Sequence, residues 1–256
     1  MVGAHFNEEF KKHNYANGSV YEGVWRGNRR HGQGSFKWPS GAAYDGNFRN
    51  DRRHGKGTIL YADGTTYSGE WRNDKRNGVG EFSWLNGSLY KGDFRDDAMH
   101  GVGTLTMADK SSYTGTWRNN KKNGNGNMNY KDGSVYTGTW RDDKRDGEGK
   151  MTWADGTTYE GEFIEDIKNG IGTYTWPNKC QYVGDWEMGK RTGHGTITYP
   201  DGNKYEGNFR NNLKEGRGIF SFKDKSSYVG DWKNDLKDGK GIFTWPDGTK
   251  FNGEWY

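Results

Sequence analysis

The chain has 256 residues, a formal net charge of +4, one cysteine and only 30% hydrophobic residues. So little apolar surface is typical of disordered chains, but aromatic residues reach 16% and proline occurs only 4 times, which favours a folded protein without an aliphatic core. The lone Cys180 excludes an intramolecular disulfide framework, and no apolar run of about 18 residues could cross a membrane, so we expect a cytosolic protein that is not transmembrane.

The first twelve residues precede the repeated part of the chain. Phe6 and Phe10 lie four residues apart among charged side chains, a spacing that fits one or two turns of an amphipathic helix. We expect residues 1–12 to form an N-terminal arm or cap, and residues 13–256 to form one continuous repeat array.

A period of 23 residues governs the sequence from Tyr21 onward. Positions within a repeat are counted from this tyrosine, which is position 0. Glycine stands at position 2, Trp or Phe at position 4, glycines at positions 11 and 13, and a large apolar residue at position 17. The array comprises a partial leading repeat, ten full repeats from Tyr21 and a partial eleventh repeat from Phe251. Position 0 is occupied by Tyr21, Tyr44, Tyr67, Tyr90, Tyr113, Tyr136, Tyr159, Tyr182, Tyr205 and Tyr228.

The pattern within each repeat predicts a β-hairpin. Positions 0, 2 and 4 share one face of a strand, and positions 11, 13, 15 and 17 share one face of a second strand. We expect the glycines to leave room for aromatic rings that lie flat against the backbone. Asp-Gly and Asn-Gly pairs such as Asp63-Gly64 predict tight turns, which Lys110, Lys179 and Lys225 interrupt where glycine is expected. The predicted fold is all-β: an elongated, single-layer, antiparallel array of hairpins.

This unit resembles the MORN repeat. The segment from Tyr67 to Gly87 reads YSGEWRNDKRNGVGEFSWLNG, and the same pattern recurs over nearly the whole chain. The resemblance implies an elongated, twisted sheet that binds proteins or lipid surfaces, without catalysis by the repeats themselves. Relatives built almost wholly of such repeats resemble radial-spoke-head proteins of cilia or membrane-skeleton proteins of protists.

The residues themselves offer no catalytic or metal-binding arrangement. His31, His54 and His100 share one repeat position, which separates them by multiples of about 10 Å and excludes shared metal ligation. The paired glycines lack the helix and acidic residue of a nucleotide-binding motif. We therefore predict a protein that is not an enzyme, uses no cofactor or metal and does not bind nucleic acid.

The aromatic face is the predicted protein-binding surface, because a single-layer sheet cannot cover all of its rings. A helix or an extended peptide laid along this groove is the expected mode of binding. The predicted groove residues are Trp71, Trp84, Phe94, Trp117, Tyr130, Trp140, Trp153 and Phe163.

The hairpin tips, positions 5 to 10, form a basic edge. Over ten repeats they hold 23 Lys/Arg and 13 Asp/Glu, a net charge of +10. This edge is either a solvated border that deters sheet aggregation or a surface for anionic membranes. The candidates for the second role are Arg26, Arg29, Arg30, Arg49, Arg52, Arg53, Arg72, Lys75 and Arg76.

An unpaired final strand predicts an end-to-end antiparallel homodimer through residues 228–256. Its predicted edge residues are Tyr228, Trp232, Trp245, Phe251 and Trp255.

Two functional hypotheses follow from the residues and the resemblance. The first is a scaffold that joins protein partners in a cytoskeletal assembly, for which we expect a ciliary axoneme such as the radial spoke head. The second is a module at the inner face of a membrane, whose basic tips bind anionic phosphoinositides.

Overall fold

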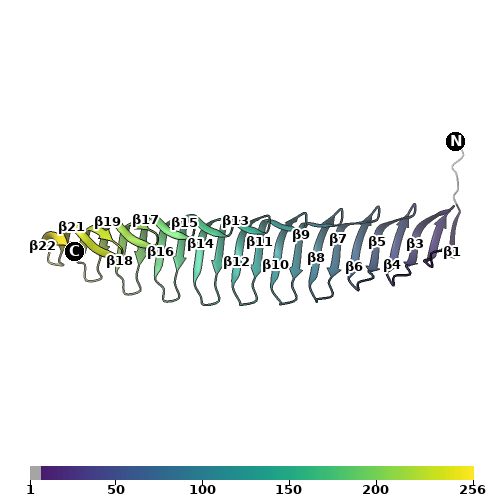
Figure 1. Ribbon diagram of the computed structural model, residues 1–256, viewed down its shortest axis with the longest axis horizontal. Helices are drawn as coiled ribbons and strands as arrows, with labels where there is room; N and C mark the ends of the chain where they lie inside the picture. Colours follow the sequence, from purple (N-terminus) through teal and green to yellow (C-terminus); the bar gives the residue numbers. More distant parts are fainter. Residues whose placement is uncertain (1–6) are drawn as a thin grey trace, which may run out of the picture. The chain divides into compact units, whose positions relative to one another are not determined.

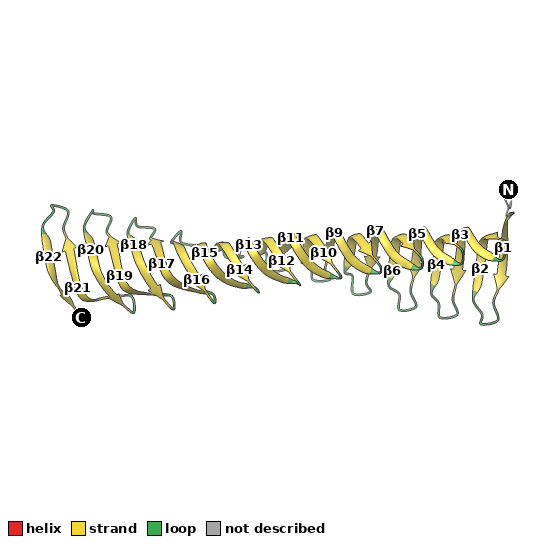
Figure 2. Cartoon of the chain, turned by 90° about the horizontal axis from the view of Figure 1, so that it is seen from above, coloured by secondary structure: helices red, strands yellow, loops and turns green. Residues whose placement is uncertain are grey.

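The computed structural model describes residues 7–256, and these residues contain 22 β-strands and no helix (Figures 1 and 2). The chain divides into two compact units, an N-terminal unit over residues 1–131 and a C-terminal unit over residues 132–256. Within each unit, every strand pairs antiparallel with the strand before it and the strand after it in the sequence. The predicted all-β hairpin repeat array is therefore confirmed.

The N-terminal unit contains eleven strands. They are β1 (Glu8–Asn14), β2 (Val20–Arg26), β3 (Arg29–Lys37), β4 (Ala43–Arg49), β5 (Arg52–Leu60), β6 (Thr66–Arg72), β7 (Lys75–Ser83), β8 (Leu89–Arg95), β9 (Ala98–Thr106), β10 (Ser112–Arg118) and β11 (Lys121–Asn129).

The C-terminal unit also contains eleven strands. They are β12 (Val135–Arg141), β13 (Lys144–Thr152), β14 (Thr158–Ile164), β15 (Ile167–Thr175), β16 (Gln181–Glu187), β17 (Lys190–Thr198), β18 (Lys204–Arg210), β19 (Leu213–Ser221), β20 (Ser227–Lys233), β21 (Leu236–Thr244) and β22 (Lys250–Trp255).

The start of the array differs from the expected N-terminal arm. Glu8–Asn14 form strand β1, which pairs with β2 over its whole length, so residues 8–12 belong to the sheet. The helical alternative suggested by Phe6 and Phe10 does not occur at Phe10, because the edge of β2 supplies hydrogen-bond partners to an extended chain. Residues 1–6, including Phe6, lie outside the described residues.

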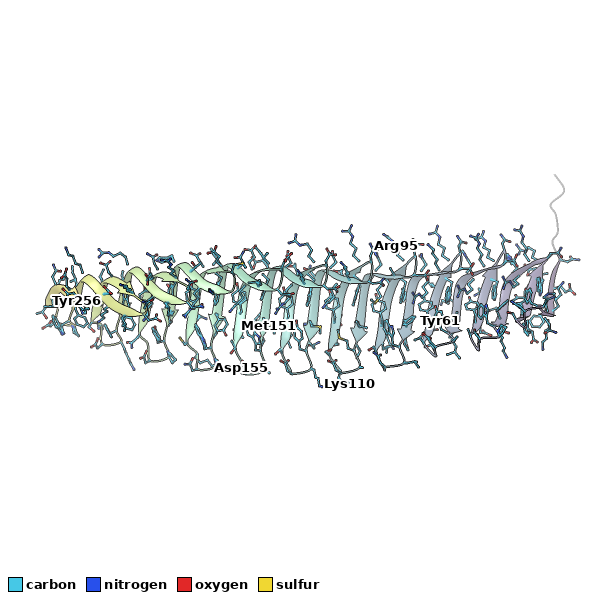
Figure 3. The ribbon with its side chains drawn as sticks, viewed as in Figure 1. Tyr61, Arg95, Lys110, Met151, Asp155 and Tyr256 are labelled. Carbon is cyan, nitrogen blue, oxygen red and sulfur yellow. The ribbon has the colours of Figure 1, made fainter. Side chains whose placement is uncertain are left out.

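Two kinds of connection alternate along each unit. A two-residue turn joins the strands of one repeat, and from the second repeat onward both of its residues are left-handed, as at Asn50 (φ 50°) and Asp51 (φ 70°). Asn and Asp tolerate this conformation, which matches the twist of a hairpin. A five-residue loop joins one repeat to the next. In Figure 3, Arg95 marks the edge with the two-residue turns and Lys110 marks the opposite edge.

The five-residue loops confirm the predicted Asp-Gly turns. In the loop over residues 61–65, Gly64 donates its N–H to the Tyr61 carbonyl (2.9 Å) and adopts a φ of 84°. The Asp63 carboxylate accepts a hydrogen bond from the Thr65 N–H (2.9 Å). Lys110, Lys179 and Lys225 replace this glycine but keep the left-handed backbone, with φ values of 74°, 70° and 74°.

Each position-0 tyrosine is a fully buried anchor of its repeat. The ring of Tyr67 lies between Trp71 and the next repeat's Phe94, with both centroids 5.1 Å away and edge-to-face. Its hydroxyl donates to the Glu70 carbonyl (2.8 Å), and burial raises the pKa of Tyr67. A Cβ atom on Gly80 would lie 2.4 Å from Tyr67 Cε2. The ring therefore explains the position-13 glycine, as the sequence pattern indicated.

The position-11 glycine has a different role from the one expected. The register of β6 and β7 shifts between Gly69 and Trp71, and Gly78 in this bulge adopts a φ of 69°. This glycine serves the backbone bend rather than making room for a ring.

Candidate functional sites

Five of the predicted groove residues belong to the core. Trp71, Phe94, Trp117, Trp140 and Phe163 are only 1–4% exposed. These position-4 rings are wedged between the tyrosines of successive repeats, as Trp71 is between Tyr67 and Tyr44. Their place as exposed contact residues is therefore corrected: they stabilise the sheet and present no surface to a partner.

The other three predicted groove residues, Trp84, Tyr130 and Trp153, occupy position 17 and are half-buried. They follow the last residue of a strand and so begin a five-residue loop. The Trp84 ring lies 4.7 Å from the position-15 ring of Phe82, and Phe82 lies 6.2 Å from Tyr61 in the preceding loop. The side chains of positions 15 and 17, most of which are aromatic rings, thus form a row along the edge of each unit that carries the five-residue loops.

A hollow of about 360 Å³ opens beside this row in the C-terminal unit. Trp153 and Tyr174, with centroids 5.9 Å apart, supply its aromatic part. The Ala154 N–H donates to Ser134 Oγ (3.2 Å) and ties two successive loops at its border. We define the ring hollow by its lining residues, which are Asp132, Ser134, Trp153, Ala154, Asp155, Thr157 and Tyr174.

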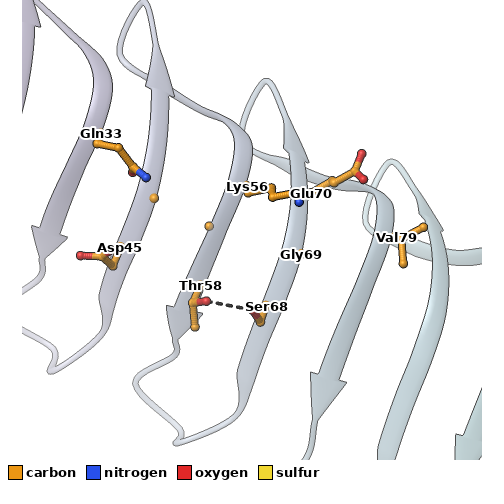
Figure 4. Close-up of a pocket in the computed structure, with 10 residues that line it drawn as sticks. Gln33, Asp45, Lys56, Thr58, Ser68, Gly69, Glu70 and Val79 are labelled. Carbon is orange, nitrogen blue, oxygen red and sulfur yellow. Dashed lines mark hydrogen bonds between the residues drawn. The ribbon is translucent and has the colours of Figure 1, made fainter.

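The opposite face of the sheet was predicted to be hydrophilic, but it also carries exposed apolar side chains. Val79 in the N-terminal unit is 61% exposed, and in the C-terminal unit Val229 (41%) pairs with Ile219 (42%) on one side and with Ile242 (40%) on the other. A hollow of about 440 Å³ on this face of the N-terminal unit carries Asp45, Lys56 and Glu70 (Figure 4). Thr58 and Ser68 share a hydrogen bond of 2.9 Å across β5 and β6 at its floor. Its charges are of both signs, and residues 7–256 contain no group of three or more His, Cys, Asp or Glu side chains that could hold a metal ion.

The nine basic candidates separate into two sets. Arg30, Arg53 and Arg76 at position 9 are half-buried, and each is paired with the position-7 aspartate of the next repeat. Arg76 donates from its backbone N–H (2.9 Å) and from Nε (3.3 Å) to Asp97 Oδ1, while its guanidinium lies 4.9 Å from the Phe82 ring. We call this arrangement the inter-repeat clamp. These three arginines are thus corrected to a structural role, because their charges are already neutralised.

The remaining six basic candidates, Arg26, Arg29, Arg49, Arg52, Arg72 and Lys75, are exposed at the hairpin tips. Arg26 bonds to Glu8 (2.5 Å), and Lys75 lies 3.8 Å from Asp96. Four arginines line a hollow of about 490 Å³ together with Asn50, His54 and Asn73. We define the arginine cluster as Arg29, Arg49, Arg52 and Arg72.

The arginine cluster holds positive charges close together although they repel one another. Arg49 and Arg52 lie directly opposite each other on paired strands, an arrangement that destabilises a sheet when the charges are alike. His54 Nδ1 is buried beside them and has no hydrogen-bond partner among the described residues. The cluster therefore combines unneutralised charge with a concave surface, and guanidinium groups so placed can bind an anionic group.

The residues of the predicted dimer edge also differ in their exposure. Tyr228 and Trp232 are buried, whereas Trp245 and Phe251 are 44% and 50% exposed. Trp255 is half-buried, and its ring lies 4.9 Å from Tyr228. Among the described strands, β22 pairs with β21 alone.

Two features escaped the sequence analysis. The C-terminal unit has exposed apolar tips, in which Ile164 faces Ile167 across a turn and Met188 is 73% exposed. Lys168, a position-9 residue, lacks the clamp aspartate because position 7 of the next repeat is Gly189. A comparison of positions 5 to 9 between repeats would have revealed both features.

The described strands, turns and glycine–aromatic face define a class of protein: an all-β array of 23-residue hairpin repeats. The profile of the MORN repeat matches ten consecutive segments, residues 21–43, 44–66, 67–89, 90–112, 113–135, 136–158, 159–181, 182–204, 205–227 and 228–250. The chain therefore belongs to the MORN repeat family.

No curated protein matches the chain. Among solved structures, it is similar to the TCP10 domain of Danio rerio CPAP in complex with a STIL peptide (10% identity, TM-score 0.45, covering 96% of this chain and 100% of that chain). It is also similar to the Drosophila melanogaster SAS-4 TCP domain in complex with a proline-rich motif of Ana2 (17% identity, TM-score 0.36, covering 78% and 90%). None of the described residues forms a helix long and apolar enough to cross a membrane.

Proposed function

We propose that this protein is a non-catalytic scaffold that binds segments of protein partners in a cytoskeletal assembly. Membership of the MORN repeat family supports this function, and the row of half-buried rings at positions 15 and 17 is the observation that carries it. Trp153 and Tyr174 in the ring hollow provide aromatic surface beside backbone groups of the loops, the combination that protein-binding grooves use. Within this proposal, the assembly is a ciliary axoneme, at the radial spoke head.

A peptide-binding experiment tests the scaffold function. Peptides selected from a random phage-displayed library on the purified full-length protein would be synthesised with a fluorophore and titrated by fluorescence anisotropy. We expect Trp153→Ala to weaken the selected peptides about tenfold or more, because a buried aromatic contact dominates such interfaces. Met188→Ala removes a 73% exposed side chain at the opposite edge of the same unit, outside the ring row, and is the control. Unchanged affinity in the Trp153 variant, with its circular dichroism preserved, would count against the ring hollow.

A second candidate function is binding to membranes that contain anionic phosphoinositides, and the arginine cluster favours it. Arg29, Arg49, Arg52 and Arg72 carry no ion pair among the described residues and share one hollow. Each basic residue near an anionic membrane contributes about 1 kcal/mol. This function would place the protein at the inner face of a membrane.

Vesicle co-sedimentation at physiological salt, with and without phosphatidylinositol bisphosphate, separates the two functions. We expect Arg49→Glu with Arg52→Glu to abolish phosphoinositide-dependent pelleting while leaving peptide binding largely intact. Arg210→Glu with Lys233→Glu reverses two tip charges in the C-terminal unit and is the control. Equal loss in both variants would indicate a response to net charge alone, and no pelleting of the natural protein would remove the membrane function.

We further propose a homodimer through residues 228–256. The exposed Trp245 and Phe251 rings support contact with a second copy. Sedimentation equilibrium at tens of micromolar measures the mass directly. Phe251→Lys should shift the protein toward monomer, whereas Phe10→Lys on β1 should not. A monomeric mass for the natural protein would refute the dimer.

A further inference from the structure

The ring hollow contains two carboxylates and no basic residue. Asp132 and Asp155 hold position 19 of successive loops, and each accepts the N–H of the second residue after it, from Ser134 (2.9 Å) and Thr157 (2.8 Å). Hydrogen bonds from the Thr157 N–H and hydroxyl lower the pKa of Asp155, so this carboxylate is ionised at neutral pH. Over residues 7–256, neither carboxylate forms an ion pair. The hollow is therefore an opening with uncompensated negative charge.

A short side chain at position 18 keeps this opening free. In another loop of the C-terminal unit, position 18 is Lys223, whose Cγ lies 3.7 Å from the place of a Cβ on Gly202 in the loop before it. The corresponding residue at the ring hollow is Ala154, and a Cβ on Gly133 would meet no atom within 4 Å. The ring hollow therefore lacks the side chain that would cover it and supply a positive charge.

The neighbouring lysines do not supply this charge either. Lys131 acts on the loop before its own, because the pKa of Asp109 is lowered by hydrogen bonds within that loop and further by Lys131. Lys168 contacts Tyr174 (4.4 Å), but its Nζ also lies 4.1 Å from the buried Trp186 ring, and Lys168 does not line the hollow. A cation that balances the two carboxylates has to come from outside the chain.

Two aromatic rings share the hollow with the carboxylates. Trp153 and Tyr174 lie 5.9 Å apart, with their planes at 47° to each other. Burial raises the pKa of Tyr174, and the charge of Asp155 raises it further, which shows that this carboxylate lies near the phenol. Aromatic faces attract cations and stack with planar guanidinium groups. Rings and carboxylates together therefore favour a planar cation with several N–H donors.

This combination distinguishes the ring hollow from similar ring pairs in the C-terminal unit. Tyr199 and Phe220 lie the same 5.9 Å apart, but position 19 of the loop before them is Asn178, so one carboxylate is missing. Beside Phe222 both loops carry an aspartate at position 19, but Lys223 adds a positive charge there.

We propose that the ring hollow binds an arginine side chain of a basic partner segment. This inference rests on the proposed scaffold function and names the chemistry of the segment that the scaffold binds. The guanidinium group stacks against Trp153 and Tyr174 and donates hydrogen bonds to the carboxylates of Asp132 and Asp155. Arginine suits the hollow better than lysine, because its planar group offers a stacking surface and several donors at once.

The test uses the full-length protein and a small probe, N-acetyl-arginine methylamide, with N-acetyl-citrulline methylamide as its neutral isostere. Two-dimensional ¹H–¹⁵N NMR follows the indole N–H of Trp153, which a Trp153→Phe variant assigns. We expect the arginine probe to shift this resonance and the citrulline probe to bind at least about tenfold more weakly, because only the charged group gains from the carboxylates. Equal affinity for the two probes would overturn the proposal.

Asparagine substitutions test the carboxylates and preserve the loops. Asn86 and Asn178 hold position 19 in other loops and accept the same backbone hydrogen bond, at 2.9 and 3.0 Å. Asp132→Asn combined with Asp155→Asn is therefore compatible with the fold. We expect this double variant to bind the arginine probe about tenfold more weakly, and unchanged binding would overturn the proposal.

A matched control separates the local site from net charge. Asp63→Asn with Asp109→Asn makes the same charge change at position 19 in the N-terminal unit and should leave the response of Trp153 unchanged. An equal loss in this control would overturn the proposal. Failure here is distinguishable from failure of the scaffold function: if selected peptides bind Trp153→Ala weakly but the arginine probe does not shift Trp153, the scaffold function stands and this inference is wrong.

Discussion

The hairpin tips of the two units differ in chemistry although their backbones are alike. Positions 5 to 10 of the five repeats that begin at residues 21 to 113 hold 13 Lys/Arg and 4 Asp/Glu, whereas the five that begin at residues 136 to 228 hold 10 and 9. Arg49 and Arg52 oppose each other at one ladder position in the N-terminal unit, and Ile164 and Ile167 do so in the C-terminal unit.

This difference separates the residues that build the fold from those that are free to vary. The buried tyrosines, their facing glycines and most of the clamps recur in both units, so these positions are constrained by packing. The tip side chains contact solvent, and their exchange between arginine and isoleucine leaves the turn unchanged. Any functional specialisation of the two units is therefore expected at the tips and along the half-buried rings.

The largest expected loss of stability follows substitution of the glycines that face the buried tyrosines in both units. Gly80→Ala and Gly172→Ala should each lower the free energy of unfolding by about 3 kcal/mol, because the new Cβ would lie 2.4 and 2.5 Å from a buried tyrosine ring. Urea unfolding followed by tryptophan fluorescence measures both. A large difference between the two variants would break the equivalence of the frameworks.

Turn glycines provide the control for this prediction. Gly87 and Gly156 have φ values of 84° and 85°, and a Cβ at either would meet no atom within 4 Å. Their alanine variants should lose only about 1 kcal/mol, which is the cost of a left-handed backbone.

Removal of the inter-repeat clamp should lower the free energy of unfolding by an intermediate amount. Arg76→Ala and Arg145→Ala each remove contacts to the next repeat's aspartate and to an aromatic ring, at 4.9 Å from Phe82 and 5.2 Å from Phe163. We expect each to lower the free energy of unfolding by about 1–2 kcal/mol in urea titrations. The exposed Arg72, changed to alanine, should alter it by less than about 0.5 kcal/mol. Comparable losses at Arg72 and Arg76 would contradict the division of the basic residues into two sets.

The lysines in glycine positions allow a stabilising prediction. Lys110→Gly and Lys225→Gly relieve a left-handed φ of 74° in one loop of each unit. Each variant should raise the free energy of unfolding by about 1 kcal/mol, and the melting temperature should rise slightly as a result. Differential scanning calorimetry measures this gain, and a loss of stability in either variant would show that its lysine side chain makes a compensating contact.

The smallest expected effect tests whether side chains at the hairpin tips can be exchanged with little loss of stability. Ile164→Arg with Ile167→Arg gives a C-terminal tip the chemistry of Arg49 and Arg52, and we expect a loss of only a few tenths of a kcal/mol from the opposed charges. Added salt should restore this loss in a urea titration, because the charges are exposed. A loss above about 2 kcal/mol would show that the isoleucines belong to the core.

The sequence was sufficient to predict the hairpin, the glycine–aromatic face and the turns, since each follows from a period of 23 combined with strand alternation. It was insufficient to distinguish the buried rings from the half-buried ones. Trp71 and Trp84 look equivalent in a list of aromatic positions, but position 4 lies between two tyrosines and position 17 lies beyond a strand end.

The prediction that grouped all nine basic residues together was partly avoidable. Arg52 and Arg53 are neighbours in a strand and therefore point to opposite faces, so alternation alone places one on the aromatic side. The pairing of Arg53 with Asp74, 21 residues away, required the distance between successive hairpins. The strand Glu8–Asn14 was not predictable from its own residues, because its conformation depends on the edge of β2.

Within each unit, strand pairing joins only consecutive strands, and the clamps reach only the next repeat. A contact order this low is unusual for an all-β chain and favours rapid folding, because little loop entropy is lost before contacts form. Each hairpin finds its packing partner as soon as the following repeat has left the ribosome. The chain can therefore fold in the direction of its synthesis, and a growing array exposes one open strand edge at a time rather than many.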